Sequence, residues 1–208
     1  MVIEDEEDKP LTTGSVTLMP EHWDGTGSGL LYGYQPRNGA YVIDNIHPGK
    51  YGISFTNAPG CYLKSVQSGT QTLDPQSIAI EDGASLDLLM IYSKNVASVT
   101  GDIETPPDQP AHSAHVLLLC EDSTPECDMA SADLDQSLHF SNDHIRPGKY
   151  LAFAAQDNDS DLWKNADFIK LIQSEAVEID LHEKEHATIH LKLIPKSETD
   201  RLRHQLGI

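Results

Sequence analysis

The sequence is poor in positive charge. It has 14 Lys and Arg against 33 Asp and Glu, which gives a formal net charge of -19 at pH 7. A surface of this sign repels phosphate backbones and anionic lipid headgroups, so we expect neither nucleic acid nor a membrane surface as a partner. It attracts cations and keeps a secreted protein soluble.

Long hydrophobic runs are also missing. No stretch approaches the roughly 18 consecutive apolar residues that a membrane-spanning helix needs, so we expect no membrane insertion. The N-terminal segment MVIEDEEDKP is acidic, whereas a signal peptide starts with basic residues. If the protein is exported, we expect its signal to lie upstream of this sequence. The 38% of hydrophobic residues still suffice for a packed core.

Cysteine is scarce. The thiols are Cys61, Cys120 and Cys127, and the absence of a CxxC pair excludes a zinc ribbon. Cys120 and Cys127 flank the segment EDSTPE and could close a small disulfide loop in an oxidising compartment. The alternative is three unpaired thiols, one of them buried.

Motifs for catalysis have little support in the sequence. It contains no GxSxG nucleophile motif. The segment HEKEH at 182–186 has the spacing of the HExxH and HxxEH zinc motifs, but these motifs need a helix, and the alternation that follows it predicts a strand. The Gly-rich run GTGSG is not followed by a lysine and a helix, so it is not a phosphate-binding loop. We therefore expect no enzyme activity and no required cofactor.

What the sequence does contain is an internal repeat. Residues that recur 100 positions later are Ile3, Glu4, Pro10, Val16, Leu18 and Glu21. IHPGKY at 46–51 reappears as IRPGKY at 145–150, and SIAIEDG at 77–83 matches AVEIDLH at 176–182. The common order and near-constant offset predict two domains, 1–96 and 97–195, followed by a tail, 196–208.

Each repeat has the pattern of short strands. Apolar and polar residues alternate in 187–193, which places Ala187, Ile189, Leu191 and Leu193 on one inward face. Pro-Gly pairs at 48–49 and 147–148 mark tight turns between such runs. This spacing predicts an all-β fold of two tandem antiparallel β-sandwiches, Ig-like or transthyretin-like.

Three segments depart from the strand pattern. Residues 161–172 predict a short helix or an ordered loop inserted in the second domain, with Trp163 and Phe168 packing it onto that domain. The tail from Ser197 predicts a fraying helix or disorder. The second repeat opens with 98–101 where the first has only Met1, so we expect the first strand of the first domain to be truncated.

Three histidines, His182, His186 and His190, have a spacing that would line up on a helix. The alternation around them indicates a strand instead. His186 and His190 would then lie about 13 Å apart on the outer face, too far to share one metal ion.

An acidic run and a group of aromatic residues are the remaining candidate sites. Asp157, Asp159 and Asp161 resemble the start of a calcium loop, but Leu162 and Phe168 stand where an EF-hand needs glycine and glutamate. A looser calcium site, or a solvated acidic loop, are the alternatives. Trp23, Tyr32 and Tyr34, in or beside the Gly-rich stretch, could stack on sugar rings or cover a sandwich edge.

These patterns resemble the carboxypeptidase regulatory-like domains, a transthyretin-like β-sandwich group common in large secreted bacterial proteins. The resemblance covers nearly the whole chain and rests on VTLMPE, on AYVIDNIHPGKY and LHFSNDHIRPGKY, and on PGCYLKSVQSG. It implies an exported setting and a non-catalytic role. Related sandwiches are often grouped as a carbohydrate-binding-like fold, which makes polysaccharide a candidate ligand by analogy.

The sequence thus predicts an extracellular, periplasmic or outer-surface module of a larger bacterial protein. We expect it to bind polysaccharide or a cell-surface protein and to adjoin neighbouring domains of its parent chain. The alternative is a purely architectural spacer, and calcium binding or a transthyretin-like hydrolase are further alternatives.

Overall fold

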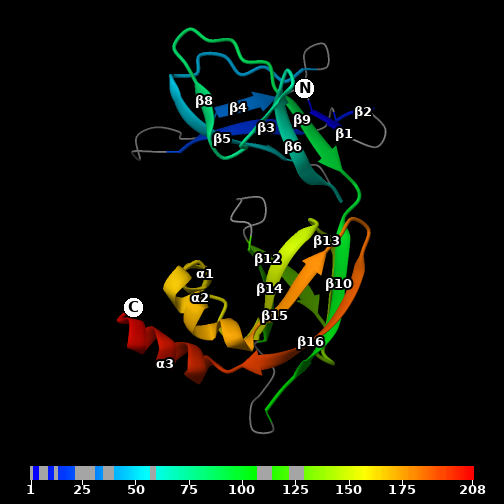
Figure 1. Ribbon diagram of the computed structural model, residues 1–208, viewed down its shortest axis with the longest axis vertical. Coiled ribbons are helices and arrows are strands. Elements are labelled where there is room, and N and C mark those ends of the chain that lie inside the picture. Colours follow the sequence, from blue (N-terminus) through cyan, green and yellow to red (C-terminus); the bar gives the residue numbers. More distant parts are fainter. Residues whose placement is uncertain are drawn as a thin grey trace. The chain divides into compact units, whose positions relative to one another are not determined.

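The computed structural model of the protein describes residues 2–4, 9–11, 14–21, 31–34, 40–56, 60–106, 114–121 and 129–208. Strands dominate these residues, so the predicted all-β class is confirmed, with a few helices near the C-terminal end (Figure 1). The chain divides into two compact units, Met1–Asn95 and Val96–Ile208. In the described part of the chain, no helix has the length and apolarity to cross a membrane.

The first unit contains two sheets. A 5-stranded sheet has the order β2-β1-β9-β6-β7, with bounds Lys9–Pro10, Val2–Glu4, Leu89–Ser93, Tyr62–Ser68 and Gln71–Leu73. A 4-stranded sheet has the order β4-β3-β5-β8, with bounds Leu31–Tyr34, Ser15–Pro20, Gly49–Thr56 and Ile78–Ile80. Buried side chains of both sheets, such as Leu18 and Met90, meet in one hydrophobic cluster, so the core lies between the sheets.

The second unit is built from one 7-stranded sheet with the order β11-β12-β13-β10-β16-β14-β15. The bounds, in that order, are His115–Cys120, Met129–Leu134, His139–Ile145, Ala97–Glu104, His186–Ile194, Gly148–Ala155 and Val177–Leu181. Because β11 also pairs with β14, the sheet closes into a ring, and among the described strands β15 lies outside this ring, paired with β14.

Not every strand pair is antiparallel, contrary to the predicted antiparallel sandwiches. The first strand of each unit pairs in parallel with the last, β1 with β9 and β10 with β16. Alternation of side chains indicates which face of a strand is buried, but it does not indicate which strand lies alongside.

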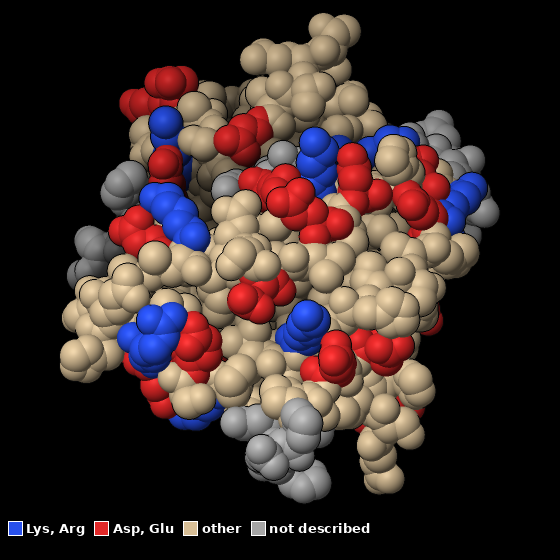
Figure 2. Space-filling view, turned by 60° about the horizontal axis from the view of Figure 1, so that its bottom comes forward, with Lys and Arg blue, Asp and Glu red and all other residues tan. Residues whose placement is uncertain are grey.

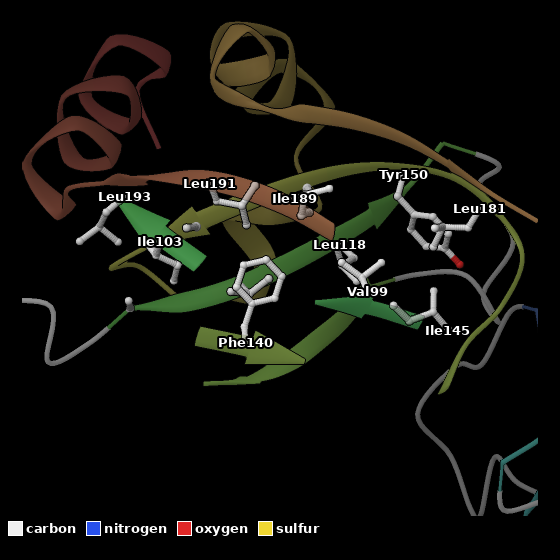
Figure 3. Close-up of a cluster of buried hydrophobic side chains, with 14 of the residues drawn as sticks. Val99, Ile103, Leu118, Phe140, Ile145, Tyr150, Leu181, Ile189, Leu191 and Leu193 are labelled. Atoms are coloured by element: carbon white, nitrogen blue, oxygen red, sulfur yellow. The ribbon is translucent and has the colours of Figure 1, made fainter. Parts of the chain in front are cut away.

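Two hydrophobic clusters stabilise the second unit. One fills the interior of the ring, where Val99, Leu118 and Ile145 lie close together (Figure 3). The other covers the outer face of β11 and β14 with the helices α1 (Ser160–Trp163), α2 (Ala166–Ile172) and α3 (Lys196–Leu206). A 3-10 turn, Gln173–Glu175, follows α2. Because β11 and β14 are buried on both faces, their sequences are almost continuously apolar.

The two segments that the sequence left open are both helical. Asp159 and Asn165 cap the N-termini of α1 and α2 with their side chains. Trp163 and Phe168 are buried against each other with ring centroids 5.4 Å apart, as the sequence predicted for this insertion. The tail forms α3, which ends at Gly207 in the left-handed conformation.

Corresponding strands of the two units share one hydrogen-bond register. Val16 lies opposite Phe55 across β3 and β5, and Val116 lies opposite Ala154 across β11 and β14. The amide of Glu21 donates to the carbonyl of Lys50, and the amide of Glu121 to that of Lys149, both at 2.9 Å.

The sequence comparison of the two repeats misaligns one pair of strands by two residues. Ile78 lies opposite Tyr51, and Ile179 lies opposite Tyr150, so Ile78 corresponds to Ile179 and not to Val177. A shift of two residues keeps every side chain on the same face of a strand, so alternation alone did not detect it.

Candidate functional site: an apolar cleft in the first unit

The first unit contains an open cleft of about 770 Å³. Its floor is formed by core residues of both sheets, among them Leu18, Ile53 and Met90. One wall is the segment 40–46 and the other is the segment 80–89. Since the floor is core, a ligand in this cleft would contact the interior of the unit directly.

Most of each cleft wall lies outside the described strands. Ala40 forms a single bridge, and neither 41–48 nor 81–88 is assigned to a strand in the described structure. Each wall exposes a large hydrophobic residue, Val42 at 45% and Leu86 at 39%. Exposed apolar side chains beside an apolar floor are features of a surface that binds a ligand.

The described charged residues that line the cleft are all acidic. They are Asp44, Glu81 and Asp87, and no Lys or Arg of the described ranges lines it. The cleft therefore favours an apolar ligand whose ends carry positive charge.

Tyr41 is the titratable group of the cleft besides its acids. Among the described lining residues there is no His, Cys or Lys. The Tyr41 hydroxyl donates to the carbonyl of Leu11 at 3.1 Å, and burial raises the pKa of this phenol. The ring of Tyr41 packs edge-on against Phe55. These contacts hold the Tyr41 ring in place as part of the cleft wall.

The aromatic residues predicted to bind sugar are only partly described. Trp23 lies outside the described residues, and so do the side chains of Tyr32 and Tyr34. The backbones of these tyrosines lie in β4, opposite Thr17 and Ser15 of β3.

The acidic run ends in a network that holds helix α3. The side chain of Asp157 is only 8% exposed, and its Oδ2 lies 3.1 Å from Arg203 and 3.5 Å from Lys196. The Thr199 hydroxyl contacts the same oxygen at 3.3 Å. Desolvation raises the pKa of Asp157, but the amide of Asp159, the two cations and Thr199 outweigh it and hold this pKa below its usual value.

The other two aspartates of the predicted calcium loop lie at the start of helix α1. Asp159 binds Arg203 at 2.8 Å and caps α1, and Asp161 lies in the first turn of α1. The guanidinium of Arg203 thus occupies the position between Asp157 and Asp159 that a cation would need. Sequence reasoning missed Thr199 and Arg203, although with Leu202 they follow the spacing of one helix face.

Each of the three histidines has its own partner. His182 contacts Glu185 at 3.0 Å, His190 contacts Asp102 at 2.8 Å, and His186 contacts the hydroxyl of Ser98. His186 and His190 are exposed on β16, and Ile189 and Leu191 between and beside them are buried. Among the residues the structure describes, no group of three or more His, Cys, Asp or Glu could hold a metal ion.

The cysteines lie at separate places. Cys61 is half-buried beside the core of the first unit. Cys120 ends β11, and Cys127 lies outside the described residues, so their pairing stays a prediction.

Neither the sequence models of known families nor the curated proteins contain a match to this chain. Among solved structures, it is similar to the Bacillus anthracis TIE protein at 12% identity and TM-score 0.31, over 93% of this chain and 32% of that one. It is similar to a streptococcal ancillary pilin at 10% identity and TM-score 0.35, over 92% and 60% of the two chains. A third similar structure is GBS52, the minor pilin of Streptococcus agalactiae, at 9% identity and TM-score 0.32, over 88% and 83%.

The chain therefore spans about a third of the first of these structures and 60% of the second. At such TM-scores the similarities carry no argument about function.

Proposed function

We propose that the chain is a non-catalytic binding module of a larger bacterial protein at or beyond the cell surface, built from two copies of one β-sandwich domain. The shared register of β3–β5 and β11–β14 supports the duplication. The resemblance to carboxypeptidase regulatory-like domains supports the exported setting and belongs to the same proposal.

The two domains have different roles in this proposal. The second is closed on itself, and helices cover an outer face of its sheet, so it is suited to a stable support. The first has the open apolar cleft, which is the observation that carries the binding role. We favour a cell-surface protein over polysaccharide as the ligand of the cleft, because the cleft has an apolar floor and each wall exposes a large hydrophobic residue, Val42 or Leu86.

The charge distribution is consistent with a protein ligand. Figure 2 shows that on this face Lys and Arg lie beside Asp and Glu and do not gather into a patch. On helix α3, for example, Arg201 pairs with Glu198 and Lys196 with Asp200. No concentration of positive charge is seen there that would attract nucleic acid.

The test is binding of the labelled chain to intact bacterial cells and to isolated wall polysaccharide. We expect binding to cells that Leu86→Asp, in the cleft, reduces. Leu171→Asp is the matched control, because Leu171 is 40% exposed on α2 and lies outside the cleft. Equal binding by both variants would remove the cleft from the proposal, and absence of binding to any surface would favour the spacer alternative.

The sugar hypothesis has its own test. A glycan array compares the natural chain with the Trp23→Ala variant. Enrichment of the natural chain on a polysaccharide, and loss of that enrichment in the variant, would support sugar binding through the Gly-rich loop. No enrichment would leave a protein as the ligand.

A further inference from the structure

Both walls of the cleft carry carboxylates. Asp44 lies on the wall 40–46, and Glu81 and Asp87 lie on the wall 80–89. All three residues are exposed, and within the described part of the chain none of their carboxylates has an ion pair or a side-chain hydrogen bond. A positive group of a ligand would therefore meet negative charge from both walls.

The second unit pairs several of its carboxylates internally. On α3, Glu198 pairs with Arg201 and Asp200 with Lys196, at 2.6 Å in both cases. These acids already have a cation beside them, so they attract an external cation less strongly than the carboxylates of the cleft do.

Each wall also exposes a hydrophobic side chain close to its carboxylates. Val42 lies two residues before Asp44, and Leu86 directly precedes Asp87. The floor below consists of core residues such as Leu18. The cleft thus combines an apolar contact surface with negative charge on both of its walls.

This combination determines which chemistry the ligand needs. Apolar side chains of a ligand gain affinity when contact with the floor and with Val42 and Leu86 removes them from water. Positive groups next to those side chains gain from the carboxylates and steer the ligand to the cleft. A second copy of this chain does not fit, because its net charge of -19 would repel the cleft.

Resting on the proposed function, we propose that the protein bound by the cleft presents an apolar segment flanked by Lys or Arg. Its apolar side chains enter the cleft, and its cations lie above the two walls, near Asp44, Glu81 and Asp87. The partner is thus recognised by a surface that is basic as well as apolar.

Three synthetic peptides of equal length separate the two contributions. KKLVLKK has an apolar centre and basic flanks, EELVLEE has the opposite charge, and KKSGSKK keeps the charge but lacks the apolar centre. Each peptide carries a fluorophore and is titrated with the full chain at low salt, with fluorescence anisotropy as the readout. We expect saturable binding of KKLVLKK and at least about tenfold weaker binding of the other two.

Variants without the carboxylates test the charge. Asp44→Asn and Asp87→Asn should each weaken binding of KKLVLKK about two- to fivefold, as is typical of exposed charge pairs. Together with Glu81→Gln, the triple variant should bind at least about tenfold more weakly. The matched control is Asp82→Asn: Asp82 is exposed beside Glu81 but is not among the described residues that line the cleft, so we expect an effect well below twofold.

Salt and the apolar residues complete the test. At about 1 M salt the charge variants should bind like the natural chain, because the Debye length falls to about 3 Å. Leu86→Ser and Val42→Ser remove apolar contacts without adding charge and should weaken binding at both salt concentrations, whereas Leu171→Ser should not. All substituted side chains are exposed, so circular dichroism is expected to show that the variants fold.

Three results would overturn the inference: no binding of KKLVLKK, equal binding of KKLVLKK and EELVLEE, or undiminished binding by the triple variant. Binding of dodecylamine without any peptide binding would replace the protein segment with a small amphiphilic cation.

Binding to intact bacterial cells separates this inference from the proposed function. Cell binding that Leu86→Asp reduces but the triple variant retains would refute only the basic partner. Absence of cell binding by the natural chain, with KKLVLKK still bound in the cleft, would refute only the proposed surface ligand.

Discussion

The hydroxyl of Tyr150 donates a hydrogen bond to the carbonyl oxygen of Arg146 at 2.7 Å. The first unit repeats this contact between Tyr51 and His47 at 2.8 Å. In both units the bond spans the Pro-Gly turn that leads into the central strand, β5 or β14. A tyrosine ring buried in the core thus fixes the turn in front of it.

Tyr150→Phe and Tyr51→Phe should each lower the free energy of unfolding by about 1 kcal/mol, because each leaves a carbonyl without its hydroxyl donor. Urea titration of the two variants measures the loss. Similar losses are expected if the two units are copies of one design. A loss confined to one variant would speak against that equivalence.

Strand positions could be predicted from the sequence because alternation marks which face of a strand is buried. The row Ala187, Ile189, Leu191 and Leu193 illustrates this: Ile189, Leu191 and Leu193 are buried, and Ala187 is half-buried. The neighbours of each strand could not be predicted, since the parallel pairing of β10 with β16 joins residues 88 positions apart, as the contact of Thr100 with Thr188 shows.

The cleft could not be predicted from local pattern either. The cleft depends on how segments far apart in the sequence pack, and the half-burial of Ile46 and Leu88 beside it becomes visible only in the packed structure. Helix α3 was left open because its sequence is mostly polar. Its position depends on two buried residues, Leu202 and Thr199, and on the ion pairs of Arg203.

The anchor of α3 gives a second prediction. Arg203→Ala should destabilise the second unit by about 2 kcal/mol, because it leaves the buried carboxylate of Asp157 without its closest cation. Arg201→Ala is the control on the same helix: its pair with Glu198 is exposed, so we expect a loss below about 0.5 kcal/mol. Equal losses in urea titration would refute the anchoring role.

The pH dependence of this anchor follows from the lowered pKa of Asp157. A carboxylate with a lowered folded pKa stabilises the fold above its unfolded pKa, near 3.8, and loses that contribution as the pH falls through the folded value. The stability difference between the natural chain and Asp157→Asn should therefore be constant near neutral pH and shrink below about pH 4. A difference that grows on acidification would contradict the assignment.

The cysteines give a third prediction. If Cys120 and Cys127 form the proposed disulfide, the denatured, unreduced protein should contain one thiol that reacts with Ellman's reagent, that of Cys61, and reduction should release two more. Loss of the bridge in Cys127→Ser should cost about 2.5 kcal/mol by the loop-entropy model. Detection of three reactive thiols before reduction would show that the protein contains no disulfide.

Gly101 gives a fourth prediction. Gly101→Ala should destabilise the second unit by about 2 kcal/mol or more, because the added methyl group would overlap Phe140 and the backbone of Ile189. Thr100→Ala, on the exposed face one residue earlier, should cost well under 1 kcal/mol. Thermal unfolding of the two variants checks the contrast, and equal melting temperatures would mean that β10 does not pack as described.

The central claim is that the cleft of the first unit binds a ligand at the cell surface. Binding of the labelled chain to intact bacterial cells, compared between Leu86→Asp in the cleft and Leu171→Asp outside it, tests this claim most directly. We predict that Leu86→Asp weakens binding at least about tenfold and that Leu171→Asp does not. Equal binding by the two variants would contradict the claim.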